Sequence, residues 1–487
     1  MVPTSLPRLQ VTINGQGLSE SGMLVGVRID QRLNMPAACE LTLEPQSKAG
    51  FLLGKPGERI ELRVGGPDER LLFAGEVCAR EVIHAAKAAP RVVVRAYDGL
   101  IELVRAQRVR AHVGVTPADL LEELAGEAGL RVSSDERGPV FAHLLQAHQT
   151  NLALCADICA RAGLYFHLAE NTLELFPLSR SEPAWKPVHD DDVLRLESTE
   201  SNTAAPTIKA WGWHPRSDEI FSAETNAAVA TRGERLMTSH HVDDAPQTRA
   251  AVRGVAERNA ARCSQMLALC TGDARLRPGV RVFFPHHAGV ADDGYLVCRA
   301  IHRFSTETGY VTEISSEPPS PPESAPGSAI VLGIVSQIDA ARFVAKVRLP
   351  AMDNIESDWM KVVSPGGGPK TGLLLMPHLE DPVLVLCAEN DPGRGIIVGG
   401  LIADRGPNLD THGDELPFQL RTRNGIKLEL SDETKTLRFE DARGSRVVLD
   451  PNGIEVLARG DLQIRAPGKT ITIAAARIDF KKAEGEA

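Results

Sequence analysis

Residues 419–480 carry the most regular alternation of apolar and polar side chains in the chain. Ile426, Leu428 and Leu430 alternate with Lys427 and Glu429. A period of two is typical of strands that bury one face. Glycines at positions 444, 453, 460 and 468 separate the apolar runs, as expected for turns. The pattern therefore predicts a series of short strands with one apolar face.

Roughly sixty residues of short strands are too few to bury such a face within one chain. Their unpaired edges would also invite pairing with other chains. Two arrangements would cover the apolar face: an ordinary small β-domain packed on the rest of the protein, or three copies wound about one axis as a prism. Periodicity alone does not separate them. In the prism, the core positions would be Ile454, Val456, Leu462, Ile464, Ile471 and Ile473.

Short apolar runs bounded by Gly and Pro also dominate residues 9–110. They predict a barrel or sandwich, with strands over 11–13, 24–29, 39–43, 60–64, 71–77 and 92–96.

Helical patterns appear in residues 111–199. Thr116, followed by Pro117 and Asp119, is typical of a helix start, and Gly129 of its end. A second helix is expected over 151–162, ending at Gly163, with a strand hairpin after it. These residues therefore predict a helical insert between β regions.

A second β region follows over 200–316 and contains a long Ala- and Arg-rich helix, expected from Ala245 to about Leu269. Its Pro278-Gly279 turn and strand resemble those at Pro56-Gly57, and Val297-Cys298 resembles Val77-Cys78. This internal similarity predicts two related β-barrel-like domains, over about 9–110 and 200–316, around the insert.

The remaining chain divides into four parts. Residues 317–329 form a Pro-rich linker. Strand patterns over 330–403, one of them at 372–375, suit a small closed barrel of the oligonucleotide/oligosaccharide-binding (OB) kind. A polar loop over 404–418 then leads to the strand series of 419–487. The predicted fold class is mainly β with a helical insert.

Composition excludes some functions. The net charge of −10 argues against nucleic acid as a partner, since that would need a basic surface. No apolar run is long enough for a membrane span. The N-terminus lacks the pattern of a secretory signal, so we expect synthesis in the cytoplasm. Eight scattered cysteines, mostly in apolar runs, suit reduced and buried thiols.

No catalytic motif is present, so we expect no catalytic residues, no cofactor and no metal site. The glycine run 366–368 lacks phosphate-loop spacing and is expected to be a barrel loop. Cys155 and Cys159 share a helix face but have no second pair nearby, and the pairs at 240–241 and 286–287 are expected to be surface histidines.

At the barrel the sequence resembles a family, the VgrG-like and phage baseplate spike proteins of contractile injection systems. The resemblance rests on the order and spacing of Gly333-Ile334-Val335, residues 345–350, 357–362 and 390–399. Residues 73–77, 272–279 and 295–297 are similar to the family's hub. Glu380-Asp381-Pro382 departs from the Gly-Asp-Glu turn that is usual in the family.

The resemblance implies a hub over residues 1–316, an OB barrel, and a C-terminal trimeric β-prism needle. It implies a structural central spike, a homotrimer that joins the inner tube and baseplate proteins at its hub to a tip protein and pierces the target envelope. The chain would belong to an assembled contractile particle and contact a target membrane transiently. It lacks the His-x-His apex of some relatives, so a separate PAAR-type protein is expected to cap the needle. Which machine carries it stays open.

Two other classes of function are left by the sequence. A carbohydrate- or receptor-binding tail fibre would be favoured if the isolated C-terminal part bound glycans. An enzyme would need an activity that no motif here predicts.

Overall fold

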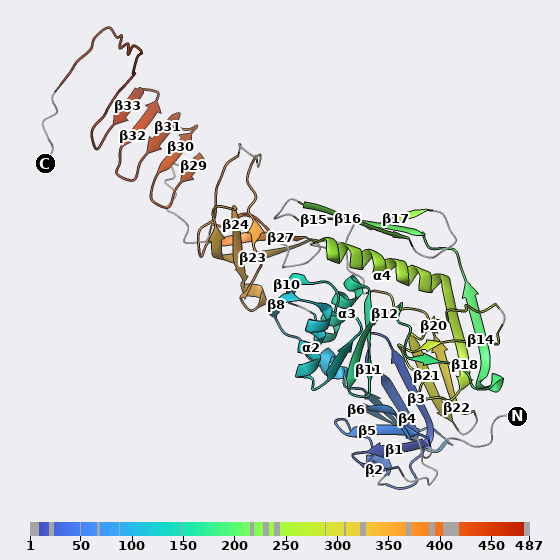
Figure 1. Ribbon diagram of the computed structural model, residues 1–487. Helices are drawn as coiled ribbons and strands as arrows, with labels where there is room; N and C mark the ends of the chain where they lie inside the picture. Colours follow the sequence, from blue (N-terminus) through green and yellow to red (C-terminus); the bar gives the residue numbers. More distant parts are fainter. Residues whose placement is uncertain are drawn as a thin grey trace. The chain divides into compact units, whose positions relative to one another are not determined.

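The computed structural model describes residues 9–18, 24–48, 50–65, 69–86, 88–147, 149–214, 219–226, 233–237, 244–287, 289–305, 308–321, 328–366, 372–388, 395–402 and 418–481. The chain divides into two compact units, residues 1–401 and 402–487. Strands make up 47% of the described residues and helices 14%, which confirms the mainly β fold class with a helical insert (Figure 1).

The largest element of the first unit is an 11-stranded sheet. Its order is β14-β18-β22-β21-β3-β4-β7-β6-β5-β1-β2. The first eight strands in this order are β14 (Val193–Glu200), β18 (Ser264–Thr271), β22 (Gly309–Ser315), β21 (Arg299–Ser305), β3 (Leu24–Arg32), β4 (Ala38–Leu43), β7 (Arg91–Tyr97) and β6 (Arg70–Ile83). The sheet ends with β5 (Arg59–Val64), β1 (Leu9–Ile13) and β2 (Gln16–Gly17).

The sequence-predicted strands of residues 9–97 are therefore present, and strands of both predicted β regions share one sheet. Alternating side chains of β3, β4 and β7 point into one apolar core, as period two requires; Ile29, Leu41 and Val94 are among its buried members. The domain boundaries themselves stay a prediction.

The helical insert contains α1 (Ile101–Arg105), α2 (Pro117–Glu127) and α3 (Asn151–Ala162). Thr116 and Asp119 form a reciprocal capping box at the start of α2, and Gly163 ends α3 in the left-handed conformation. Both helix starts and the α3 end are as predicted. The other elements here are β8 (Arg110–Val115), β9 (Arg131–Ser134), β10 (Phe141–Gln146), β11 (Leu164–Ala169) and β12 (Thr172–Pro177), the last two forming the predicted hairpin.

Helix α4 (Ala245–Cys263) is shorter than predicted. The sequence predicts a helix to about Leu269, and this is wrong, because β18 begins at Ser264. Met266, Ala268 and Cys270 are buried while Leu267 is exposed, so the period changes from helical to two at that point. Pairing with β14 and β22 decides the conformation there.

Beside α4 lies a small sheet of β15 (Thr207–His214), β16 (Glu219–Asn226) and β17 (Glu234–Met237) (Figure 1). Ile208, Ala210 and Met237 pack on Ala251, Val252 and Ala256 of the helix. Three short strands form another sheet: β13 (Ala184–Trp185), β19 (Arg281–Val282) and β20 (Tyr295–Leu296).

The predicted OB barrel is a six-stranded sheet. It is formed by β23 (Ser328–Asp339), β24 (Val344–Leu349), β25 (Ile355–Glu356), β26 (Met360–Lys361), β27 (Pro382–Ala388) and β28 (Gly395–Gly400). A strand predicted over residues 372–375 is absent from this described stretch, and β25 is present instead. Leu373, Leu374 and Leu375 are exposed, so their apolar run does not mark a core strand. Most of the 366–368 glycine run lies outside the described residues.

The second unit contains a five-stranded antiparallel meander. Its strands are β29 (Phe418–Arg421), β30 (Lys427–Ser431), β31 (Thr436–Glu440), β32 (Arg446–Asp450) and β33 (Gly453–Leu457), each paired only with its neighbours in sequence among the described residues (Figure 1).

Candidate functional site

The strand register aligns the apolar side chains of the meander in two rows. In the first row, directly opposed residues on successive strands are Phe418, Leu430, Leu437, Leu449 and Ile454. In the second, they are Leu420, Leu428, Phe439, Val447 and Val456. Both rows lie on one face because the positions differ by two along each strand. The meander therefore has one continuous apolar face.

The opposite face of the meander carries charged and polar groups. Gln419 donates from Nε2 to Glu429 Oε2 at 2.9 Å, and Lys427 pairs with Glu429. Arg446 pairs with Glu455 at 3.2 Å. Glu429 is buried while Leu430 beside it is 43% exposed. In the single chain, the apolar side of β30 is thus more exposed to solvent than its polar side. In a folded core the apolar side would be the buried one.

The structure places two of the six predicted prism-core residues on this face. Ile454 and Val456 lie at the ends of the two rows on β33, and their side chains are 73% and 55% exposed. The other four come after β33 and are also exposed: Leu462, Ile464, Ile471 and Ile473. All six predicted core side chains are exposed in the single chain, so their burial in a prism core stays a prediction.

Residues 458–481 are described and contain no strand. The strands predicted over this stretch are therefore not formed by the single chain. A strand needs a hydrogen-bonding partner, and in an interwound prism that partner would be another chain.

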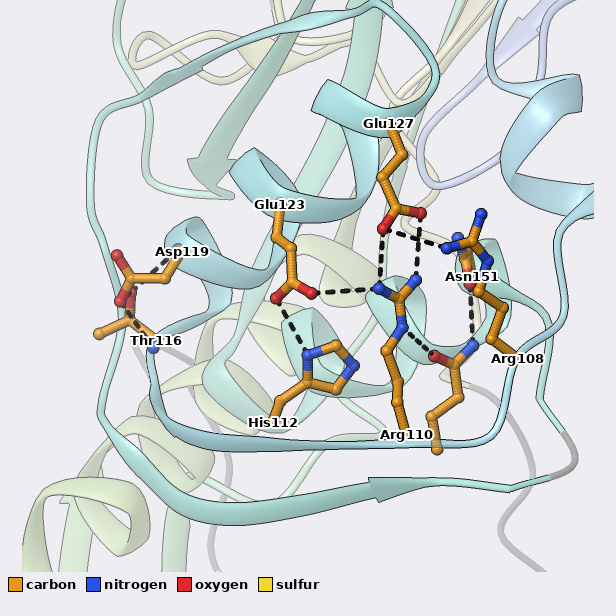
Figure 2. Close-up of polar contacts among 9 residues, drawn as sticks. Arg108, Arg110, His112, Thr116, Asp119, Glu123, Glu127 and Asn151 are labelled. Atoms are coloured by element: carbon orange, nitrogen blue, oxygen red, sulfur yellow. Dashed lines mark hydrogen bonds and ion pairs between the residues drawn. The ribbon is translucent and has the colours of Figure 1, made fainter. Parts of the chain in front are cut away.

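A second cluster, which we call the β8–α2 network, was not predicted. Arg110 of β8 forms a two-bond fork with Glu127 of α2, with Nη1–Oε1 at 2.7 Å and Nη2–Oε2 at 3.1 Å (Figure 2). Arg110 Nη1 also donates to Glu123 at 3.2 Å, and the same carboxylate meets His112 Nδ1 at 3.0 Å. Arg110 lowers the pKa of Glu127, chiefly through these hydrogen bonds.

The network continues into buried amides. The side chain of Gln146, on β10, accepts from Arg110 Nε at 3.4 Å and donates to Asn151 Oδ1 at 2.9 Å. Both amide side chains are fully or almost fully buried. The fork and the amides together hold β8 and β10 against α2 and the start of α3 (Figure 2).

The same strands contact the barrel. Leu145 and Ala147 belong to one apolar cluster with Val335, Val347 and Met352 of the OB domain. The β8–α2 network thus lies directly behind the surface on which the helical insert meets the barrel. The individual residues carry no sequence motif; only the i, i+4 spacing of Glu123 and Glu127 could have suggested a shared partner.

The cysteines and histidines named in the sequence analysis form no reactive or metal-binding group among the described residues. None of the eight cysteines forms a disulfide within the described chain, and seven of them are buried, as the sequence predicts. Burial raises the pKa of the Cys155 thiol to about 12. Across the described ranges, no three His, Cys, Asp or Glu side chains are grouped to hold a metal ion. His286 and His287 lie in that part of the chain, whereas His240 and His241 fall outside it.

None of the helices in the described residues has the length and apolar character needed to span a membrane.

Family models match two parts of the sequence. The Alg8 N-terminal domain matches residues 3–261, which is more than half of the chain. The type VI secretion system/phage-baseplate injector OB domain matches residues 331–401. Among curated proteins, none matches the sequence significantly.

Solved structures share the fold at low sequence identity. A type VI secretion component of E. coli, described as similar to the T4 phage tail proteins gp27 and gp5, is 13% identical, with a TM-score of 0.56 over 80% of this chain and 99% of its own. The Francisella PdpA-VgrG complex, half-lidded, gives 9% identity and a TM-score of 0.58 over 93% and 88%. A prophage 43 kDa tail protein of Shewanella oneidensis gives 13% and 0.50 over 63% and 97%.

Proposed function

This chain belongs to the family of the Alg8 N-terminal domain and is a VgrG-like baseplate spike protein, and we propose that it forms the homotrimeric central spike of a contractile injection machine. Its role is structural rather than enzymatic. The N-terminal half forms the hub, the OB barrel follows, and the C-terminal strands form the needle that pierces the target envelope.

One observation carries the proposal: the two apolar rows of the meander. A single layer of short strands with an open apolar face is unstable in water. Burying Ile454 and Val456 alone would each contribute about 1.5–3 kcal/mol. Three copies wound about one axis would turn this face inward and leave ion pairs such as Arg446–Glu455 outside. Such a prism has paired edges and resists compression along its length.

The partners follow from this role. The hub binds the inner tube and baseplate proteins, and a PAAR-type tip protein caps the C-terminal end of the needle. The needle contacts the target membrane only while the machine fires. The protein resides in the assembled particle.

The proposal is tested by the native mass of the full chain. Static light scattering is expected to give three times the 52.5 kDa chain mass. Ile454→Asp would place three carboxylates on the apolar axis and is expected to abolish the trimer. Glu455→Asp is the matched control, because it changes the neighbouring residue on the polar face and should leave the trimer intact.

The same variants test the role in the machine. In cells that produce the particles, deletion of the gene should prevent their assembly, as counted by electron microscopy. The wild-type and Glu455→Asp chains should restore assembly, and Ile454→Asp should not. A wild-type monomer, or a trimeric Ile454→Asp protein, would contradict the proposed needle.

A further inference from the structure

A cavity of about 890 Å³ lies between the 11-stranded sheet and the helical insert. Its wall is formed mainly by β3, β5, β6, β11 and β12 and by the segments 180–186 and 274–280. Small-molecule sites in proteins usually have volumes of roughly 300–1,000 Å³. The residues of the wall belong neither to the β8–α2 network nor to the C-terminal meander. The cavity is therefore distinct from the sites described above.

Two arginines share one carboxylate in the wall of this cavity. Glu174 Oε2 accepts from Arg180 Nη1 at 2.8 Å, and Glu174 Oε1 accepts from Arg277 Nη2 at 3.0 Å. Arg180 also has Asp135 as an ion-pair partner, at 3.1 Å. The second terminal nitrogen of Arg277, Nη1, is buried and has no hydrogen-bond partner among the described residues. Arg277 thus has one charged donor that the protein does not use.

Two other side chains of the wall are almost fully buried and also lack partners. His167 on β11 is 2% exposed, and Gln31 on β3 is 8% exposed. His167 Nε2 and Gln31 Oε1 form no hydrogen bond within the described part of the chain. Gln31 Nε2 donates to Leu72 O at 3.3 Å, which identifies Oε1 as the free end of the amide. Gln31 therefore has an unused acceptor.

The imidazole of His167 is neutral at pH 7. Burial, with a smaller contribution from Arg277, lowers the pKa of His167 to about 3. A neutral imidazole donates from one ring nitrogen and accepts at the other. Nε2 can therefore pair with either a donor or an acceptor of a ligand.

The wall as a whole carries positive charge. Six of its side chains are Arg or Lys, and four are Asp or Glu. Burial raises the pKa of one of the four, Asp98, to about 7, so its charge is only partly present at neutral pH. A concave wall of this sign favours an anionic ligand.

Buried polar atoms without partners destabilise a fold unless water or a ligand pairs with them. Three such atoms belong to the wall of one cavity. We propose that this cavity binds a small organic anion that carries both a carboxylate or phosphate oxyanion and a hydroxyl group. Arg277 Nη1 would donate to the oxyanion, Gln31 Oε1 would accept from the hydroxyl, and His167 Nε2 would pair with one of the two. This binding goes beyond the proposed spike role and does not depend on the trimer.

Isothermal titration calorimetry of the full-length protein tests the site with citrate and with glycerol 3-phosphate. Each probe carries an oxyanion and a hydroxyl group. At least one of them is expected to bind at one site per chain with a Kd below about 1 mM. The tighter of the two distinguishes a carboxylate ligand from a phosphate ligand.

Arg277→Gln removes the unused donor and is expected to weaken binding of that probe roughly 10- to 100-fold, as for the loss of one charge-assisted hydrogen bond. Glu174 keeps its bond from Arg180 in this variant. Arg303→Gln is the matched control, because Arg303 also pairs with one glutamate, Glu313, at 2.9 Å but lies on β21 outside the wall. It should leave the Kd unchanged.

The hydroxyl group is tested with the same anions without it, tricarballylate and propyl phosphate. The wild-type chain should bind the matching one at least about tenfold more weakly, because Gln31 Oε1 then stays unpaired. Gln31→Met keeps the length of the side chain but removes the acceptor. It is expected to bring the two affinities together.

Each outcome supports or overturns the site. Binding that is weakened in Arg277→Gln but not in Arg303→Gln supports it. No binding of either probe up to about 10 mM overturns it and leaves a cavity that holds water only. Equal binding by wild type and a folded Arg277→Gln chain, as judged by circular dichroism, shows an adventitious contact elsewhere and overturns it as well.

A second comparison applies if Arg277→Gln does not fold. Loss of the preference for the hydroxyl group in Gln31→Met then supports the site, and an unchanged preference overturns it. Light scattering on the same samples reports the trimer separately, so failure of the site and failure of the proposed spike are distinguishable.

Discussion

At the scale of single residues, Arg110 holds the β8–α2 network together. Its side chain is 20% exposed and joins Glu123, Glu127 and Gln146 at once. Arg108 nearby also faces Glu127, but at 3.6 Å and with 60% of its side chain exposed. Charge-assisted forks stabilise more than exposed single pairs. Substituting each arginine in turn therefore compares a part-buried fork with an exposed single ion pair.

We expect Arg110→Met to lower the free energy of unfolding by about 1–2 kcal/mol, since it leaves a part-buried carboxylate and a buried amide without their donor. Arg108→Met should change it by less than about 0.5 kcal/mol. Urea denaturation followed by circular dichroism measures both. Equal effects of the two substitutions would show that the fork has no special role.

Two buried histidines, His302 and His167, have lowered pKa values. Burial lowers the pKa of His302 to about 4, although its Nδ1 lies 3.0 Å from the Tyr310 hydroxyl. Burial lowers the pKa of His167 to about 3, with a further contribution from Arg277. Both imidazoles take up a proton more readily when the chain unfolds, where their pKa is near 6.5. The stability gained by keeping both imidazoles neutral in the folded chain is therefore complete above pH 6.5. It is lost progressively as the pH falls below that value.

Stability should thus fall as the pH drops from about 6.5 towards 4, by about 1.4 kcal/mol per pH unit for each histidine. The urea midpoints at pH 7.5 and pH 5 measure this loss. His302→Gln is expected to reduce the difference between the two midpoints, because one titrating group is gone. His189→Gln, at an exposed position, should leave the difference unchanged. A difference that is the same in His302→Gln as in the wild type would rule out this assignment.

At the scale of elements, period-two alternation continues beyond the last strand of the meander. Leu462, Ile464 and Ala466 keep one parity, and Gln463 and Arg465 take the other. The single chain forms no strand between residues 458 and 481, so the partner of this stretch must come from elsewhere if the pattern is structural. The proposed prism supplies that partner.

We expect Ile464→Asp to abolish trimer formation, because three unpaired carboxylates would meet on one axis. Gln463→Asp introduces the same charge at the neighbouring position of the other parity and should be tolerated. Native mass by light scattering distinguishes them. A soluble trimer of Ile464→Asp would show that residue 464 faces outward.

Element boundaries were the least accurate part of the sequence prediction. Capping at Thr116 and the stop at Gly163 were recognised because local side-chain and backbone chemistry determines them. The end of α4 was misplaced by several residues. Residues 264–269 have no strong helix-stopping residue, and pairing with strands distant in sequence decides their conformation.

At the scale of the whole molecule, the internal repeat connects the fold to the proposed function. Two similar β regions of each chain share one sheet, and a trimer would contain six such regions. A ring of six similar units on a three-fold needle would match a six-fold tube to a three-fold spike.

The sequence by itself determined the local features: the strand and turn pattern, the helix caps, the OB barrel, the similarity of the two Pro-Gly motifs, and the apolar parity of the C-terminal strands. These depend on residues that are neighbours in the chain, where periodicity and capping act. Only the tertiary structure placed both β regions in one sheet, aligned the apolar rows across five strands, and joined Arg110 to Glu123 and Glu127. Those arrangements depend on which distant segments pair and in which register, and that choice is made by packing of the whole chain.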